Sequence, residues 1–185
     1  MTRSETSDPD GHGIAVIEGV FEPELCRSLL GQARQLLSSG QGFHASSARW
    51  HRAVVEDSAP VLIHDLPDPA GGPLIELLRR DELLGAGDAR AMLYAWTHGS
   101  YIPWHHDGSY GGGAVTVYLN DRWDAAWGGH FLYRTPEGSV AAPVVPHFNR
   151  GVINGSALKH CTTMVEPIAP EPRFTLQVFA KGRSK

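Results

Sequence analysis

The sequence predicts a mainly β fold of the α+β class, in which a double sheet or barrel carries supporting helices near the N-terminus. Short apolar runs of β type recur between glycine and proline turns throughout the second half of the chain. Only two segments place apolar residues at helical spacing, and both precede those runs. Strands that follow one another so closely favour antiparallel sheets over a parallel sheet, which needs a helix between each pair of strands.

The chain is predicted to begin with a tail and a strand. Residues 1–12 are polar and show no apolar pattern, so we expect a flexible tail. The apolar run Gly13–Glu18 indicates a strand. Because the sequence shows no internal repeat and no linker, the 185-residue length predicts one domain over residues 13–182.

Two helices are expected next. Pro23 suits a first helical turn, and the leucines after it continue at helical spacing to a glycine-containing stop near Ser38. Pro73 can open a second helix that runs to about Leu84. Between them, residues 41–72 are rich in proline and glycine, and they predict loops with short strands at 53–55 or 61–63.

Eight short strands are expected in the second half of the chain, each bounded by turn residues. They are Ala91–Trp96, Tyr101–His106, Ala114–Asn120, His130–Tyr133, Val140–Val145, Arg150–Asn154, Thr162–Val165 and Phe174–Ala180.

The composition narrows the classes of protein to which the chain can belong. The net charge of −4 gives no basic face, so we expect no nucleic-acid partner. No apolar run reaches the ~20 residues of a membrane span, and the N-terminus has no apolar signal segment, so we expect no membrane partner. Two cysteines are too few for a disulfide framework, which favours a reducing compartment and a cytoplasmic protein. The sequence does not indicate an oligomeric state.

The segment Tyr101–Asp107 contains a candidate metal motif. On an extended strand, residues i and i+2 share a face, so His105 and Asp107 point the same way while His106 points the other way. A His-x-Asp pair with a distant third histidine is the facial triad of non-haem Fe(II) oxygenases, and it leaves open positions for a co-substrate and dioxygen. Alone, the motif is equally compatible with a half-exposed histidine at a strand end.

Two downstream residues strengthen the metal interpretation. His160 begins the run Cys161–Val165. Arg173 opens the apolar strand Phe174–Ala180, where a guanidinium is unfavourable unless it binds an anion. The planar guanidinium group of Arg173 can bind a carboxylate through two parallel hydrogen bonds.

The stretch from Tyr94 to Phe179 resembles the 2-oxoglutarate/Fe(II)-dependent dioxygenases in their prolyl-4-hydroxylase-like branch. The front end, a strand and a first helix that begins near Pro23, is similar as well. The matching motifs are Tyr94, Gly99, His105-x-Asp107, Val117–Asn120, Trp123, Gly128–Gly129, Pro146-x-Phe148-Asn149-Arg150, His160, Val165 and Arg173.

The resemblance implies a double-stranded β-helix, or jelly roll, and the cofactors Fe(II), 2-oxoglutarate and O2. It implies that His105, Asp107 and His160 hold the iron and that no further catalytic residue is needed. Arg173 would meet the far carboxylate of 2-oxoglutarate, with Tyr118 as a second donor and Tyr94 near the co-substrate.

Four other residues are candidates for substrate contacts. Trp104 could stack on substrate at the mouth of the pocket, and it could equally be a core or surface aromatic residue. His130 could line the pocket or be an ordinary strand histidine. Arg49 and Trp50 lie in a polar and aromatic segment that could cover the site.

The resemblance implies hydroxylation of an aliphatic C–H bond, with release of succinate and CO2. We favour a small-molecule substrate, an amino acid or a biosynthetic intermediate, over a residue of a protein or peptide, as in prolyl hydroxylation. A non-enzymatic 2-oxoglutarate or metal sensor could use the same pocket. A hydrolytic zinc site could use the same three ligands, but it would leave Arg173 without a role.

Overall fold

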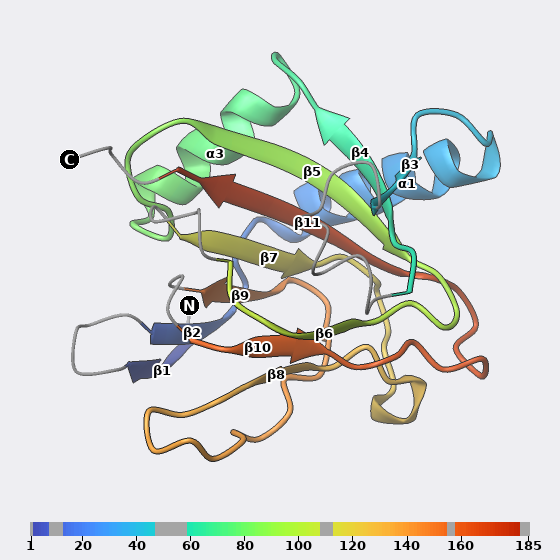
Figure 1. Ribbon diagram of the computed structural model, residues 1–185. Helices are drawn as coiled ribbons and strands as arrows, with labels where there is room; N and C mark the ends of the chain where they lie inside the picture. Colours follow the sequence, from blue (N-terminus) through green and yellow to red (C-terminus); the bar gives the residue numbers. More distant parts are fainter. Residues whose placement is uncertain (1, 8–12, 47–58, 108–112, 155–157, 182–185) are drawn as a thin grey trace.

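The structure is a computed structural model that describes residues 2–7, 13–46, 59–107, 113–154 and 158–181. Within these residues, two antiparallel sheets face each other (Figure 1). The larger sheet has eight strands in the order β1-β2-β9-β7-β11-β5-β4-β3, and the smaller has three in the order β6-β10-β8. The predicted mainly β, double-sheet fold is therefore confirmed.

The larger sheet brings together strands from both ends of the chain. Its members are β1 (Thr2–Ser7), β2 (Gly13–Glu18), β3 (His44–Ala45), β4 (Leu62–Leu66), β5 (Ala89–Trp96), β7 (Ala114–Tyr118), β9 (Arg150–Asn154) and β11 (Arg173–Ala180). The smaller sheet contains β6 (Ile102–His105), β8 (Phe131–Tyr133) and β10 (His160–Thr162). A short 3-10 helix, η2 (Ala125–Trp127), precedes β8.

Helices α1 (Pro23–Ser38) and α3 (Gly71–Arg80) cover one face of the larger sheet (Figure 1). The predicted first helix is confirmed, with Pro23 in its first turn. The second helix begins two residues before Pro73 and ends four residues before Leu84. Gly71 lies so close to the backbone of Leu66 that an added Cβ would meet its carbonyl oxygen at 2.1 Å, so this start requires glycine.

The opposite face of the larger sheet looks toward the smaller sheet. Along β11, Phe174, Leu176 and Val178 belong to the core beneath the helices. Tyr118 and Val152 instead pack with Phe131 of the smaller sheet. Because side chains alternate along a strand, Arg173, Thr175 and Gln177 share the face away from the helices. We call this surface of the larger sheet, which carries Arg173, the inner face.

Within the segment expected to be a flexible tail, the structure describes Thr2–Ser7. These residues form β1, which pairs with β2 from Thr2 opposite Glu18 to Ser7 opposite Gly13. A polar segment can form an edge strand because its ladder is made by backbone groups and needs no apolar side chains. Composition alone therefore did not reveal it.

Two further strand predictions differ from the structure. Val140–Val145 forms only isolated bridges, Val140 with Arg134 and Val144 with Phe131. The strand predicted at Thr162–Val165 begins earlier, because His160 pairs with both neighbouring strands. The proposed strand at 61–63 is β4, and the alternative at 53–55 lies outside the described residues.

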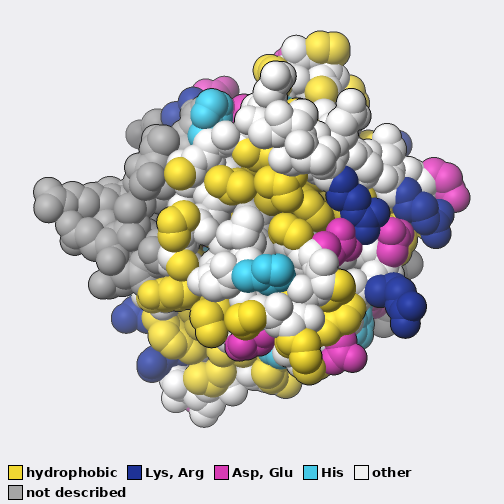
Figure 2. Space-filling model, turned by 90° about the vertical axis from the view of Figure 1, so that its right-hand side faces the viewer, with side chains coloured by type: hydrophobic (Ala, Val, Ile, Leu, Met, Phe, Trp, Pro, Cys, Tyr) yellow, Lys and Arg dark blue, Asp and Glu magenta, His cyan; other side chains and the backbone are white. Residues whose placement is uncertain are grey.

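The connection from β5 to β6 and the connection from β10 to β11 meet at the end of the sheets where β5 stops and β11 starts. Backbone hydrogen bonds join them, from Gly99 N to Val165 O at 2.8 Å and from Val165 N to Ser100 O at 3.0 Å. They carry the exposed hydrophobic residues Tyr101, Met164 and Ile168. Figure 2 shows hydrophobic side chains gathered on the face at the right-hand side of Figure 1, where these connections turn. None of the described helices is long and apolar enough to span a membrane.

Candidate active site

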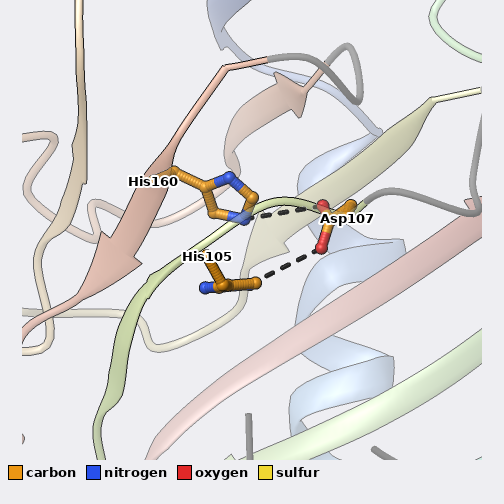
Figure 3. A group of neighbouring side chains, drawn as sticks. All are labelled: His105, Asp107 and His160. Atoms are coloured by element: carbon orange, nitrogen blue, oxygen red, sulfur yellow. Dashed lines mark ion pairs between the residues drawn. The ribbon is translucent and has the colours of Figure 1, made fainter. Parts of the chain in front are cut away.

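Two paired strands of the smaller sheet place two histidines side by side. His105 ends β6 and His160 begins β10, directly opposite it in the ladder. Their ring centroids are 4.2 Å apart. Asp107 follows two residues after His105, with its Oδ1 3.6 Å from His105 Nε2 and its Oδ2 3.5 Å from His160 Nε2 (Figure 3). One ligand atom from each residue lies within 4.8 Å of the other two.

Backbone carbonyl groups fix the tautomers of both histidines. His105 Nδ1 lies 2.8 Å from Pro103 O, and His160 Nδ1 lies 3.1 Å from Leu158 O. A carbonyl oxygen only accepts, so each Nδ1 carries the proton and each Nε2 keeps a free lone pair. Metal-binding histidines are oriented by this kind of contact. Two such nitrogens and one carboxylate fit a divalent transition metal.

The surroundings hold Asp107 and His160 in the protonation states that metal binding needs. His160 is 5 % exposed, and the ring of Phe131 stacks on it at 5.2 Å between centroids. Burial lowers the pKa of His160, so the neutral imidazole is favoured. Burial alone would raise the pKa of Asp107, but the two nearby imidazoles and the amide of Asn154 outweigh it and lower that pKa. The ligands need little proton release before they can bind a cation.

Arg173 is a buried cation with no carboxylate within ion-pair distance in the described part of the chain. Its side chain is 1 % exposed, and its guanidinium lies over the rings of Trp96 and Tyr118, at 4.2 and 5.6 Å from their centroids. It donates to Gly129 O, while its Nε has no hydrogen-bond partner within the described ranges. Burial lowers the pKa of Arg173 to about 10, which leaves it charged near neutral pH. Such a group fits an incoming anion.

The chain around Arg173 is held on both sides. Asn120 Oδ1 accepts from Phe174 N at 2.7 Å, and Asn120 Nδ2 donates to Pro172 O at 3.0 Å. Gly129 lies against the side chain of Arg173, and a Cβ there would be 3.1 Å from Arg173 Cδ. Asparagine and glycine thus fix the start of β11 and leave space for the guanidinium.

The two tyrosines predicted to be near the co-substrate flank β11 on the inner face. Thr175 pairs with Tyr94 on one side and with Tyr118 on the other. Both rings are buried. Burial raises the pKa of Tyr118 against the opposing effects of Arg173 and Arg150, so its hydroxyl keeps its proton and can donate.

Of the four predicted substrate residues, the two that the structure describes, Trp104 and His130, alternate along their strands with residues that face the metal-ligand candidates. Trp104 precedes His105 on the strand and so lies on the other face, where it is 37 % exposed beneath the guanidinium of Arg134. His130 likewise alternates with Phe131, the residue that stacks on His160, and its buried Nε2 makes no hydrogen bond to any residue that the structure describes. Arg49 and Trp50 lie outside the described residues.

Sequence reasoning missed several residues that contact the site. Phe131 packs on His160, Trp96 on Arg173, and Asn154 donates to Asp107. Each lies on a strand whose position was predicted, so alternation could have placed them on one face. Their partners come from distant strands, which alternation does not identify. The one available signal was Asn154 itself, an amide that directly follows the apolar residues Val152 and Ile153.

Two facing antiparallel sheets, with two histidines and one carboxylate converging between them, are the arrangement of the non-haem iron oxygenases. The sequence pattern of the 2OG-Fe(II) oxygenase superfamily matches residues 90–181, about half of the chain. The chain belongs to this superfamily, and it is a 2-oxoglutarate-dependent dioxygenase of jelly-roll fold that uses Fe(II), 2-oxoglutarate and O2. No curated protein matches the chain.

Solved structures share the fold at low sequence identity. A prolyl-4-hydroxylase from Pseudomonas putida has a TM-score of 0.74 and 15% identity, with 95% of each chain covered. A prolyl hydroxylase from Trichoplax adhaerens, in complex with a hypoxia inducible factor peptide fragment, has a TM-score of 0.70 and 18% identity over 93% of this chain and 84% of that one. The α-ketoglutarate-dependent epimerase SnoN from nogalamycin biosynthesis has a TM-score of 0.59 and 15% identity, covering 92% and 78%.

Proposed function

We propose that His105, Asp107 and His160 hold the catalytic iron and that Arg173 binds the far carboxylate of 2-oxoglutarate. The observation that carries this proposal is the convergence of two free Nε2 atoms and one carboxylate within 4.8 Å. Arg173 supplies the buried positive charge that a dicarboxylate co-substrate requires. Tyr118 offers a second donor, and Tyr94 borders the same side of the inner face.

The residues of the chain bind the metal, orient the co-substrate and shield the site from water. Bound Fe(II) and 2-oxoglutarate supply the oxidation, which converts 2-oxoglutarate and O2 to succinate and CO2 and inserts one oxygen into a substrate C–H bond. His105, Asp107 and His160 would hold the metal and would leave coordination positions for the co-substrate and O2. Arg173 fixes one end of the co-substrate, so its keto acid end is presented at a defined place. Phe131 and Trp96 keep water from His160 and Arg173.

We propose a small polar molecule, an amino acid or a biosynthetic intermediate, as the substrate that is hydroxylated. Thr116 and Gln177 are paired in the ladder, and both lie on the inner face. Gln177 is 9 % exposed and offers both an amide donor and an acceptor. Groups of this kind can orient a polar substrate beside the metal. The likeness to SnoN supports a substrate of this class.

A prolyl residue of a peptide is the second candidate substrate. The likeness to the Pseudomonas putida prolyl-4-hydroxylase, at a TM-score of 0.74 over 95% of both chains, favours it. Two substrate panels, free amino acids with small biosynthetic precursors and proline-containing peptides, separate the candidates. A mass increase of one oxygen in the first panel supports the small-molecule proposal, and an increase only in the peptides overturns it in favour of prolyl hydroxylation.

The catalytic proposal itself is tested by CO2 release from labelled 2-oxoglutarate with Fe(II) under air. We expect slow release without substrate and none in His105→Ala or Asp107→Ala. Full turnover in both variants would show that the ligand assignment is wrong. Binding of 2-oxoglutarate with no release under any substrate would instead favour a sensor.

A further inference from the structure

Asp107 differs from the two histidines in how its backbone is held. His105 and His160 are paired with each other across β6 and β10. β6 ends at His105, and Asp107 follows it outside any strand. No ladder therefore fixes its backbone, and the direction of its carboxylate depends on what its side chain contacts.

Asn154 provides the contact from Asp107 to the larger sheet. It is the last residue of β9, and it pairs with Ile14 of β2 on one side and with Ala114 of β7 on the other. Its side chain is 4 % exposed. Asn154 Nδ2 donates to Asp107 Oδ2 at 2.9 Å. Asn154, which is paired with a strand on each side, therefore contacts Asp107, which lies beyond the end of β6.

The orientation of the Asn154 amide is set by this contact. Asn154 Nδ2 also lies 3.1 Å from His160 Nδ1, which faces Leu158 O at the same distance, and 3.5 Å from His160 Nε2. The shortest of its contacts is with Asp107 Oδ2, which can only accept. The reversed amide would place an oxygen against the carboxylate of Asp107. In the orientation shown, Asn154 Oδ1 is buried without a hydrogen-bond partner among the described residues, which is unfavourable. An apolar residue would avoid that loss, so the donor accounts for an amide at this position.

We propose that Asn154 is a positioning residue for the metal site, an inference that rests on the proposed iron ligands. By occupying Asp107 Oδ2, it couples the carboxylate to the larger sheet and leaves Oδ1 with both lone pairs free for the cation. The carboxylate would then offer one oxygen to the cation, which would leave room for the co-substrate. Partners of this type tune metal affinity although they do not touch the metal.

The test is a titration with Co²⁺, followed by its visible absorption, and it needs no turnover. Asn154→Leu keeps the approximate volume of the side chain and removes the donor, and Asn154→Ala is a second variant if the first does not fold. Ile153→Ala is the matched control: it loosens the same strand from the other face, where Ile153 packs beneath the helices.

We expect Co²⁺ to bind about 10- to 100-fold more weakly in the Asn154 variants, the range found for partners of metal ligands. The shape of the absorption spectrum should also change, because a freed carboxylate can bind through both oxygens. Ile153→Ala should lower the midpoint of thermal unfolding and leave both the affinity and the spectrum unchanged. Unaltered affinity in Asn154→Leu, or an equal loss in Ile153→Ala, overturns the inference.

The two proposals fail in distinguishable ways. A wild-type protein that binds no Co²⁺ would overturn the metal site and the role of Asn154 together. Wild-type binding that is abolished in His160→Ala but unaffected in Asn154→Leu would leave the metal site in place and reject only the role of Asn154.

Discussion

At the scale of single residues, the site carries groups that folding alone would not select. Arg173 is a buried guanidinium without a carboxylate partner in the described residues, and Asn154 has a buried carbonyl oxygen without a donor. Each is unfavourable in a protein interior. Such residues are expected where a ligand completes the interactions, and both lie on the inner face of the larger sheet.

Replacing Arg173 should therefore move stability and binding in opposite directions. Arg173→Met keeps much of the volume and removes the unpaired charge, so we expect the ligand-free protein to gain about 1 kcal/mol or more. For a chain of this size that is a rise of roughly 2–4 °C in the unfolding midpoint. The rise that 2-oxoglutarate produces in the Fe(II) protein should disappear. A destabilised variant that still responds to 2-oxoglutarate would contradict this role.

His160 makes stability depend on pH when no metal is bound. Burial holds its pKa in the folded protein below the ordinary 6.5, so the unfolded chain binds the proton more readily. The free energy of unfolding should therefore fall as the pH decreases through 6.5, by up to about 1.4 kcal/mol per unit. Urea unfolding in EDTA at pH 7.5 and 5.5 should show a smaller fall in His160→Leu, and the same fall as wild type in His44→Leu, a change at an exposed histidine.

At the scale of elements, the turn before β8 supports the arginine. Gly129 has a φ of +63° and faces Arg173 Cδ and Val165 Cγ2. Gly138 has a φ of +86°, but an added Cβ there would meet nothing within 4 Å. Backbone strain is thus common to both positions, while contact with Arg173 belongs only to Gly129.

This difference gives a paired prediction. Gly129→Ala and Gly138→Ala should each lose about 1–2 kcal/mol of stability, because a left-handed backbone disfavours a side chain. Only Gly129→Ala should also weaken 2-oxoglutarate binding, measured as its KM in CO2 release. Equal KM values in the two variants would mean that Gly129 does not serve the arginine.

Local sequence patterns predicted where the strands and helices lie better than they predicted which strands pair with one another. The predicted strands at Gly13–Glu18 and Arg150–Asn154 and the helix from Pro23 are confirmed, since each depends on spacing within one segment. β1 was missed because backbone pairing with β2 holds it, and composition carries no trace of that. Val140–Val145 has strand-like residues but makes only isolated bridges. Propensity does not decide whether a partner strand is within reach.

At the scale of the whole molecule, the site exists because the two sheets face each other. The smaller sheet supplies His105 and His160, and the larger supplies Arg173, Tyr118 and Asn154. Alternation placed His105 and Asp107 on one side of a strand from sequence alone. The contacts of Asn154 with Asp107 and of Phe131 with His160 join residues far apart in the chain, so no local pattern contains them.

One iron and one 2-oxoglutarate are expected to bind together between the sheets. The decisive experiment records the visible absorption of the protein with Fe(II) under anaerobic conditions as 2-oxoglutarate is added. We predict a charge-transfer band that saturates at one equivalent, is lost in His160→Ala, and needs much more 2-oxoglutarate in Arg173→Met. A protein that binds both components without this band, or an undiminished band in His160→Ala, would contradict joint binding at this site.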